Sequence, residues 1–411
     1  MCDMRNASLE ANPDRRSICI VARRFLWEDS LPKISIVIPV WNAQDHLRAC
    51  LDSVIGQTLR DIEVICVDDA SSDGSPEILR EYELGDPRVR VITYADNVTA
   101  SRARKDGVLA STGAYVMFVD NDDTIEPDTC ERLYASVQAE PVDILHFGTS
   151  ITTVTDLPPE RIRWMEEFIK PYDGVLQGDE VLAGAFSENR LYNFTVWDKL
   201  YSAELCKKSF TRVKDGRFPR GEDKYAYFIL SYYARTYRGV QDEALYHYHF
   251  GRGTTGHNLI SLAQFDGACT MARAADAIRA FLIEEGALDR YEAVYAKSRD
   301  DLLQDCVANW SRLAADDKAA GFDMMLTYWK GFEVIGKVAQ LNWGDQGHVA
   351  RLLKTSQAIN RTPGKVRVVG TYYHRYSNGG VERILSMLIK LWLELGFKVV
   401  LFTDVPPSPD D

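Results

Sequence analysis

Short apolar runs alternate with amphipathic stretches through the first third of the chain. Four runs have the length and composition of buried strands: Ile34–Asn42, Asp61–Asp69, Val89–Thr93 and Tyr115–Val119. Between them, helical periodicity covers 45–55, 76–82 and 100–110. Regular alternation of strands and helices is typical of βαβ units, whose strands run parallel. The pattern therefore predicts an α/β fold with a mostly parallel sheet and helices on both faces.

Polar and aromatic side chains follow three of these predicted strands at their carboxyl ends. Trp41 ends the first strand, Asp69 ends the second, and Asp120, Asp122 and Asp123 follow the fourth. In open parallel sheets, ligands bind in a crevice beyond the carboxyl ends of the strands. We therefore expect these side chains to meet in one crevice, although about 80 residues separate the first from the last.

The three carboxylates after the fourth strand indicate a cation site. Asp120, Asp122 and Asp123 repel one another, and hard oxygen ligands suit Mg²⁺ or Mn²⁺, which proteins bind with one or two carboxylates plus substrate phosphates. The alternative is an acidic turn that caps a following helix beginning within 124–127. An isolated Asp-x-Asp favours the turn, whereas the polar ends of the neighbouring strands favour the metal.

Six segments together resemble the family 2 glycosyltransferases, which are nucleotide-sugar-dependent enzymes with the GT-A fold. The resemblance spans about residues 33–257, and it is carried by Ser35–Asn42, Val67–Ser75, Asn97–Gly107, Asp120–Asp123, Trp197–Tyr201 and Phe218–Asp223. Each segment alone is a weak signal, but their order and number are specific. Thr99 and Lys105 depart from the family pattern, because many members carry Gly and Asn there, and these changes leave the transferred sugar open.

For the donor, the resemblance implies contacts from Pro39, Trp41, Asp69, Arg104 and Asp120. Trp41 would lie against the base, Asp69 would accept hydrogen bonds from the base edge, and Arg104 would bind the diphosphate. Asp120 would contact the ribose or the water shell of the metal ion. Each has a structural alternative: a core position for Trp41, a helix N-cap for Asp69 and a solvated helix charge for Arg104.

For the chemistry, the resemblance makes Asp122 the ligand of Mn²⁺ or Mg²⁺ and Asp223 the general base of an inverting, single-displacement reaction. Glu222 is the weaker candidate and would orient Asp223 or pair with an arginine. His249 and Arg252 would complete a pyrophosphate clamp. The alternatives are an acidic helix start for the Glu-Asp pair and an alternating Tyr/His strand with a solvated arginine.

Composition limits the function classes further. The chain has 411 residues with a net charge of −12, which argues against a nucleic-acid partner. Eight scattered cysteines without a C-x-x-C pair indicate reduced thiols and a cytoplasmic protein. The sequence has no run of about 18 apolar residues that would suit a membrane span. Since the family often uses lipid-linked acceptors, peripheral association at the inner membrane face is an open expectation.

The chain divides into four predicted parts: a leader (1–32), the GT-A domain (33–257), a helical extension (258–360) and a C-terminal segment (364–411). The extension would pack on the catalytic domain, shape the acceptor site or form a homo-oligomer contact. In the last part, the strand Lys365–Tyr373, the turn Ser377–Arg383 and the strand Phe397–Thr403 resemble the opening of a family 4, GT-B glycosyltransferase. This domain would be incomplete; the alternative is a short βαβ appendage.

Two functions remain in competition. The first is a metal-dependent transferase that moves a sugar, expected from a UDP-sugar, to a hydroxyl of a glycan or lipid-linked acceptor in cell-surface polysaccharide biosynthesis. The second is a catalytically silent nucleotide-sugar-binding or scaffold domain for a C-terminal transferase. The presence of both Asp122 and Asp223 favours the enzyme. A nucleotidyltransferase is disfavoured, because the first strand ends in Pro39–Asn42 rather than in a Gly-rich basic loop.

Overall fold

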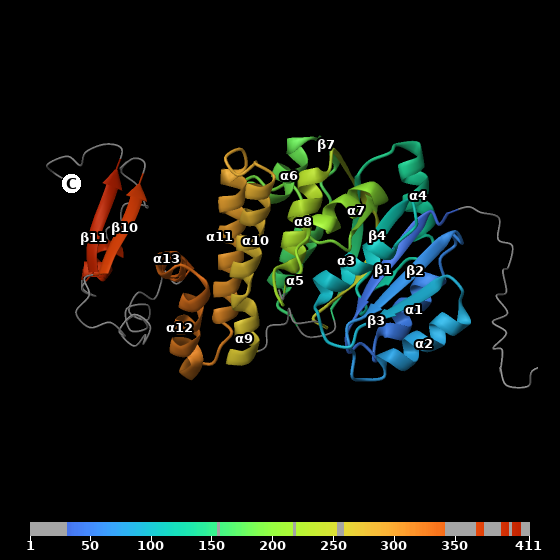
Figure 1. Cartoon of the computed structure of the whole chain (residues 1–411), viewed down its shortest axis with the longest axis horizontal. Helices are drawn as coiled ribbons and strands as arrows, with labels where there is room; N and C mark the ends of the chain where they lie inside the picture. Colours follow the sequence, from blue (N-terminus) through green and yellow to red (C-terminus); the bar gives the residue numbers. More distant parts are fainter. Residues whose placement is uncertain are drawn as a thin grey trace, which may run out of the picture.

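The computed structural model describes residues 31–153, 157–216, 219–252, 259–341, 367–373, 388–393 and 397–403. One sheet of mixed direction dominates the first half (Figure 1), with its strands in the order β3-β2-β1-β4-β8-β6-β9-β5. The four predicted strands are β1 (Ile34–Val40), β2 (Ile62–Asp68), β3 (Val89–Thr93) and β4 (Tyr115–Phe118), and they pair in parallel. The predicted α/β fold with a mostly parallel, helix-flanked sheet is confirmed.

Both faces of this parallel half are buried, as the continuous apolar runs require. Successive side chains of β1 enter different cores: Ile34, Ile36 and Ile38 pack in one hydrophobic cluster, and Val37 packs in another. The first cluster contains α1 (Leu47–Ile55), α2 (Ser75–Gly85) and α4 (Thr129–Ala139); the second contains α3 (Ala100–Ala110), α6 (Asp179–Phe186), α7 (Ala203–Arg212) and α8 (Glu222–Tyr233). The carboxyl ends of the strands remain open between these layers.

The other half of the sheet is mostly antiparallel and was not predicted. It consists of β5 (Thr124–Ile125), β6 (Ile144–Thr153), β7 (Gly174–Gln177), β8 (Lys199–Ser202) and β9 (Thr236–Phe250). β8 lies antiparallel between β4 and β6, while β6 and β9 pair in parallel. Helix α5 (Pro159–Ile169) follows β6. β5 occupies part of the segment expected to start a helix, and α4 begins only at Thr129.

The helical extension is present as expected and packs on α8. Its helices are α9 (Leu262–Cys269), α10 (Met271–Glu284), α11 (Glu292–Trp310), α12 (Lys318–Tyr328) and α13 (Gly331–Leu341). Figure 1 shows α10 and α11 between the sheet half and α12 and α13. Residues 329 and 330 separate α12 from α13. The hydrophobic cluster around α8 continues through α10 and α11, so the extension shares its core with the domain before it.

The C-terminal segment contains two parallel strands, β10 (Arg367–Tyr373) and β11 (Phe397–Thr403), and a helical stretch at 388–393. This arrangement agrees with the predicted βαβ order. The leader up to residue 30 and the turn Ser377–Arg383 lie outside the described residues. The interpretation as the start of a second transferase domain, and the four-part division of the chain, stay predictions.

Two absences concern only the part of the chain that the structure describes. No helix there is long and apolar enough to cross a membrane. The six described cysteines, all buried, are free thiols.

Candidate active site

A cavity of about 1020 Å³ opens at the carboxyl ends of β1, β2 and β4. Its walls contain most of the predicted site residues: Pro39, Trp41, Asp69, Arg104, Asp120, Asp122, Asp223 and His249. Residues as far apart in the sequence as Pro39 and His249 therefore lie around one cavity. Those from β1, β2 and β4 meet there as the carboxyl ends of parallel strands should. Arg252 is not among the lining residues, but it donates a hydrogen bond to the backbone carbonyl oxygen of Asp122.

Three non-glycine residues with left-handed backbone adjoin cavity-lining residues in the sequence: Asn42 (φ 48°), Ala70 (φ 59°) and Thr99 (φ 90°). Asn42 and Ala70 each follow a strand end, and Thr99 precedes α3. Such conformations are uncommon outside glycine, and for a β-branched residue they are strained. Thr99 thus occupies a backbone geometry that suits the glycine of the family pattern.

Asp69 organises the loop before α3. Its carboxylate accepts hydrogen bonds from Val98 N (2.6 Å), Thr99 N (2.9 Å) and Asn97 Nδ2 (2.9 Å), and only 3% of the residue is exposed. The helix N-cap alternative is wrong, because Gly74 is the N-cap of α2. The contact of Asp69 with a base edge stays a prediction; the observed role is to hold the 97–99 loop against the end of β2.

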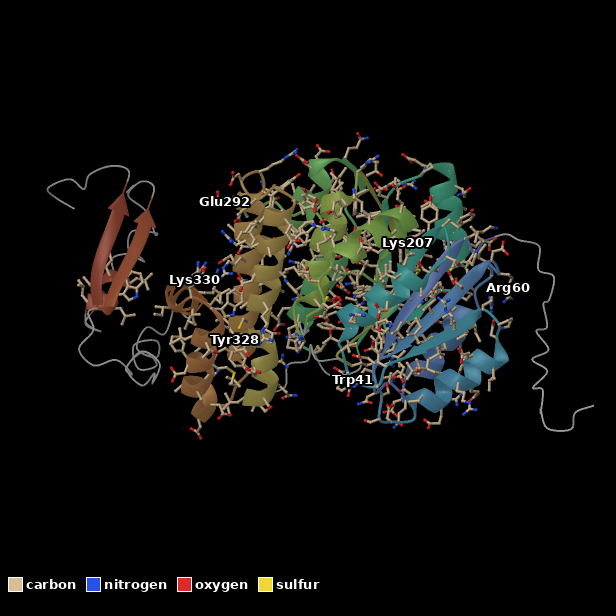
Figure 2. All side chains as sticks on the ribbon, in the orientation of Figure 1. Trp41, Arg60, Lys207, Glu292, Tyr328 and Lys330 are labelled. Atoms are coloured by element: carbon tan, nitrogen blue, oxygen red, sulfur yellow. The ribbon has the colours of Figure 1, made fainter. Side chains whose placement is uncertain are left out.

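Trp41 is 56% exposed and borders the cavity, so the core alternative for this residue is wrong. Figure 2 labels it at the end of the strands facing the helical extension, whereas Arg60 is labelled at the opposite end of the strands. Beside it, the carbonyl oxygen of Pro39 accepts a hydrogen bond from Asn121 Nδ2 at 2.8 Å. This bond ties the end of β1 to the acidic turn, a connection that the sequence pattern did not indicate.

The three carboxylates of the acidic turn have different surroundings. Asp123 has no exposed surface; it accepts hydrogen bonds from Tyr246 Oη (2.9 Å) and His249 N (2.8 Å). Tyr246 Oη also accepts a hydrogen bond from Asp120 N at 3.1 Å. Asp123 therefore anchors the turn to β9, and only Asp120 and Asp122 border the cavity.

Asp122 has the electrostatics of a cation ligand. Burial and the charges of Asp123 and Asp120 raise the pKa of Asp122 to about 7. The positive charge of Arg252, whose Nη1 donates to the Asp122 carbonyl oxygen at 2.9 Å, opposes this rise. A bound cation would relieve the repulsion that raises the pKa.

The residues at this place fit a Mg²⁺ or Mn²⁺ ion that takes most of its ligands from a substrate. Asp122 can supply a carboxylate oxygen, and the His249 side chain borders the same cavity. Within the described ranges, no three His, Cys, Asp or Glu side chains form a group that could hold an ion. Ions of this kind are often held by one or two carboxylates plus phosphate oxygens.

Arg104 connects Asp120, predicted to bind the donor, with Asp223, predicted to be the general base. It is 5% exposed, and its Nη2 and Nη1 lie 2.8 Å from Asp120 Oδ1 and 2.7 Å from Asp223 Oδ1. Helix α3 approaches β1 closely enough for this contact because Gly107 has no Cβ. A Cβ at this position would lie only 2.3 Å from Val37 Cγ1. The alternative of a solvated helix charge is wrong. The diphosphate contact stays a prediction, since both ends of the guanidinium already bind carboxylates.

Asp223 lies in the first turn of α8, beside Glu222. The turn before it needs glycine, because Gly221 has φ +82° and a Cβ there would meet Leu302 at 3.1 Å. Burial raises the pKa of Asp223, and the charge of Arg104 opposes this rise. Burial and the charge of Asp223 raise the pKa of Glu222 to about 8. The two neighbouring carboxylates repel each other, so the pair holds a proton more readily than two isolated carboxyl groups would.

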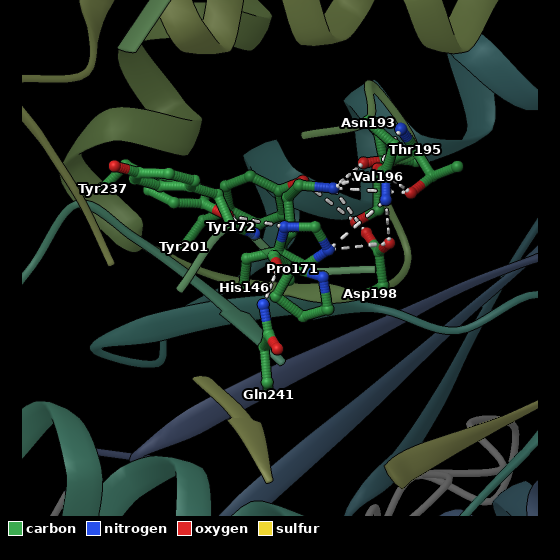
Figure 3. Close-up of polar contacts among 11 residues, drawn as sticks. His146, Pro171, Tyr172, Asn193, Thr195, Val196, Asp198, Tyr201, Tyr237 and Gln241 are labelled. Carbon is green, nitrogen blue, oxygen red and sulfur yellow. Dashed lines mark hydrogen bonds and ion pairs between the residues drawn. The ribbon is translucent and has the colours of Figure 1, made fainter. Parts of the chain in front are cut away.

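Behind Asp223 lies a buried polar network (Figure 3) in the segment that resembles the family's acceptor side. Asp198 Oδ2 lies 3.1 Å from His146 Nε2, and Asp198 Oδ1 accepts from Lys199 Nζ at 2.5 Å. Lys199 Nζ also donates to Asn193 Oδ1 (2.7 Å) and to the Thr195 carbonyl oxygen (2.8 Å). These bonds fix the loop that carries two aromatic lining residues, Phe194 and Trp197.

The wall opposite the strand ends was not predicted. It is formed by α5 and α11, through Glu160, Arg161, Trp164, Leu302, Gln304, Asp305, Ala308 and Asn309. The sequence left open whether the helical extension packs, shapes the acceptor site or forms an oligomer. The structure shows that it contributes to the cavity, and no short motif in α5 or α11 signals this.

Comparison with known proteins agrees with this geometry. Residues 35–201 match the model of the family described as Glycosyl transferase family 2. They form a glycosyl transferase family 2 domain. The chain is 31% identical over 225 residues to the putative glycosyltransferase EpsH of Bacillus subtilis, a match that covers 53% of this chain and 60% of EpsH.

A shorter match, 44% identical over 105 residues, relates this family 2 domain to the poly(ribitol-phosphate) beta-glucosyltransferase of Bacillus spizizenii. It covers 25% of this chain and 17% of that protein. The chain thus spans 60% or less of these curated relatives. Among solved structures, residues 1–349 of TarS from S. aureus share the fold, with a TM-score of 0.50, 15% identity, and coverage of 85% of this chain and 97% of that one.

Proposed function

We propose that this chain is an inverting glycosyltransferase that transfers a sugar from a nucleotide diphosphate donor to a hydroxyl group of a glycan. A UDP-sugar is the first candidate for the donor. The observation that carries the proposal is the position of Arg104, which joins Asp120 on the donor side to Asp223 on the opposite side at 2.8 and 2.7 Å. This bridge holds a carboxylate of raised pKa at a fixed distance from the strand ends. Family 2 membership of residues 35–201 supports the same chemistry.

In this proposal the strand ends bind the nucleotide. Trp41, which is more than half exposed, stacks on the base, while the loop held by Asp69 encloses it. Asp120, fixed by Arg104, accepts a hydrogen bond from the ribose. The residues with positive φ beside the lining residues, Asn42, Ala70 and Thr99, keep these loops in one shape before the donor arrives, which reduces the ordering that binding requires.

A bound Mg²⁺ or Mn²⁺ ion would supply Lewis-acid chemistry for the departure of the nucleotide. Asp122 would hold it, and Arg252 stabilises the turn that presents Asp122. His249 borders the same space and would contact the diphosphate.

On the acceptor side, Asp223 takes the proton of the attacking hydroxyl. A base with a raised pKa captures this proton more effectively at neutral pH than an ordinary aspartate does. Arg104 keeps the carboxylate oriented, and the Lys199 network holds the adjacent loop. Because one displacement occurs at the anomeric carbon, an α-linked donor gives a β-linked product.

The test is Asp223→Asn, with Asp215→Asn as the matched control, since Asp215 is exposed and pairs with Lys105 outside the cavity. We expect Asp223→Asn to reduce transfer by about 10² to 10⁴ with nearly unchanged UDP affinity. NMR of the product should show inversion. Near-normal transfer in Asp223→Asn would eliminate this base, and retention would eliminate the single displacement. A wild-type chain that binds UDP-sugars in Mn²⁺ without turnover would instead be the silent binding domain.

The biological setting belongs to the proposal as well. The name of the Bacillus spizizenii relative describes it as a poly(ribitol-phosphate) beta-glucosyltransferase, and crystal structures of TarS contain UDP or UDP-GlcNAc. For the present chain we propose a role in cell-surface polysaccharide biosynthesis, in the cytoplasm, with peripheral contact to a membrane where the acceptor is lipid-linked. A flotation assay with vesicles of anionic lipid tests that contact.

A further inference from the structure

The cavity wall formed by α5 and α11 carries an exposed tryptophan that donor binding does not use. Trp164 lies on α5, borders the cavity and is 56% exposed. Within the described ranges, Trp41 is the one other large hydrophobic lining residue that is exposed. The cavity therefore presents two exposed indoles, one at the strand ends and one on the helical wall.

A series of aromatic contacts holds Trp164 in place. Its indole stacks on Phe168, with ring centroids 5.2 Å apart and an interplanar angle of 11°. Phe168 in turn meets Phe194 edge to face, at 5.4 Å and 72°. Both arrangements are among those that aromatic pairs prefer. The packed rings restrict the rotamers of Trp164, which lowers the entropy that a ligand loses by binding to it.

The same contacts connect Trp164 with the helix turn that carries the proposed base. The ammonium nitrogen of Lys224 lies 4.4 Å from the centroid of the Phe194 ring. Lys224 directly follows Asp223 at the start of α8, and its Nζ lies 3.4 Å from Asp305 of α11. Phe194, Lys224 and Asp305 all border the cavity. These distances associate the indole with the acceptor side of the cavity.

The cavity combines this apolar surface with hydrogen-bonding groups. Glu160 lies one turn before Trp164 on the same face of α5, and Gln304 borders the cavity from α11; both are exposed. Their carboxylate and amide can bind hydroxyl groups. A sugar ring has an apolar C–H face and a hydroxyl edge, whereas an alkyl chain would leave these polar groups unpaired. At about 1020 Å³, the cavity also exceeds the roughly 300–1,000 Å³ typical of one small ligand.

We propose that Trp164 is a platform on which a pyranose ring of the acceptor stacks, while Glu160 and Gln304 bind its hydroxyls. The C–H groups of the ring carry a small positive charge and lie against the negative face of the indole. The acceptor is accordingly a saccharide, and Trp164 contributes to its selection. The inference rests on the proposed function, because it takes Asp223 as the base and the strand ends as the donor site.

The first experiment measures ligand affinities by ligand-observed NMR on the full chain with saturating UDP and Mn²⁺. The ring probes are the methyl glycosides of glucose, galactose, mannose and N-acetylglucosamine. Sorbitol offers hydroxyls without a ring, and 1-octanol offers an alkyl chain. We expect at least one glycoside to bind about tenfold more tightly than sorbitol and 1-octanol, as one well-formed stacking contact would give.

Variants then assign the platform. Trp164→Ala should remove most of the preference for a glycoside over sorbitol and leave UDP affinity unchanged, and Trp164→Phe should restore part of it, because a flat ring remains. Arg163→Ala is the matched control, since Arg163 is the neighbouring residue on α5, exposed and outside the cavity lining. Should Trp164→Ala fail to fold, Trp164→Phe and the wild-type comparison still decide.

Four results would overturn the proposal. No glycoside would bind better than sorbitol, or Trp164→Ala would act like Arg163→Ala. Tighter binding of 1-octanol than of every glycoside would assign this wall to a lipid, and a loss of UDP affinity in Trp164→Ala would assign the indole to the donor. A wild-type chain that binds no UDP in Mn²⁺ refutes the proposed function instead, and UDP affinity is measured on the same samples.

Discussion

Replacing Arg104 with methionine removes the one guanidinium that lies between Asp120 and Asp223 while preserving most of the side-chain volume. Removing one partner of a fully buried ion pair costs about 3–5 kcal/mol. The side chains of Asp120 and Asp223 keep 26% and 33% of their surface exposed, so water recovers part of this cost. We therefore expect Arg104→Met to lower the free energy of unfolding by about 2–3 kcal/mol.

The same substitution should change the pH dependence of turnover. The charge of Arg104 opposes the burial that raises the pKa of Asp223, so its removal raises that pKa further. The base must be ionised to accept a proton, and the rise of the rate with pH should therefore move to higher pH. The assay is UDP-sugar turnover across pH, together with UDP affinity and a thermal unfolding curve for each variant.

Arg102→Met is the control, because Arg102 is on the same helix but pairs with Asp106 and Asp215 outside the cavity lining. It should leave the pH profile unchanged. Two results would refute the reasoning for Arg104. A slower enzyme with an unshifted profile would show that Arg104 does not tune Asp223, and a loss confined to UDP affinity would show that Arg104 binds the diphosphate instead.

Three further outcomes follow from the site. Because burial and the neighbouring carboxylates raise the pKa of Asp122 to about 7, Mn²⁺-dependent UDP affinity should rise between about pH 6 and 8. Asp122→Ala should abolish the Mn²⁺ dependence of UDP affinity. A wild-type UDP affinity that calorimetry finds constant across this pH range would contradict the metal assignment. Trp41→Ala should weaken UDP binding about tenfold without lowering the melting temperature, because the indole is exposed, and an unchanged affinity would argue against base stacking. Burial and the charge of Lys199 lower the pKa of His146 to about 4, so the unfolded chain binds the proton first as pH falls. The free energy of unfolding should therefore decline from about pH 6.5 to 4, and it should decline by more than in His146→Gln. An equal fall of the denaturant midpoint with pH in both proteins would exclude this cause.

The parallel half of the fold and the place of the cavity followed from local sequence signals. A continuous apolar run such as Ile34–Val40 is typical of a strand that is buried on both faces, and the polar residues after each run mark where the strand ends. The strands from β5 onward could not be predicted from local patterns, because their pairing depends on contacts between distant segments. The break between α12 and α13 was hard to predict for a similar reason, because Trp329 is buried there in an extended conformation.

The site was harder to predict because identical residue types serve different purposes in it. Asp122 borders the cavity and Asp123 anchors the turn, and only the direction of each side chain distinguishes them. The partners of Arg104 are 16 and 119 residues away, so no spacing rule connects them. The family resemblance supplied candidates for the roles, while the tertiary structure supplied the bridge between Asp120 and Asp223.

Helix α11 contributes to both the hydrophobic core and the wall of the cavity. Leu303, Cys306, Val307 and Trp310 belong to the hydrophobic cluster that also contains Val37 of β1, so this side is constrained by the stability of the whole domain. Gln304 and Asn309 line the cavity and do not belong to that cluster. Asp305 also lines the cavity, but it pairs with the buried Lys224 at 3.4 Å, so its substitution would leave a buried charge unpaired. A library limited to Gln304 and Asn309 can therefore vary this wall of the cavity without changing the hydrophobic cluster.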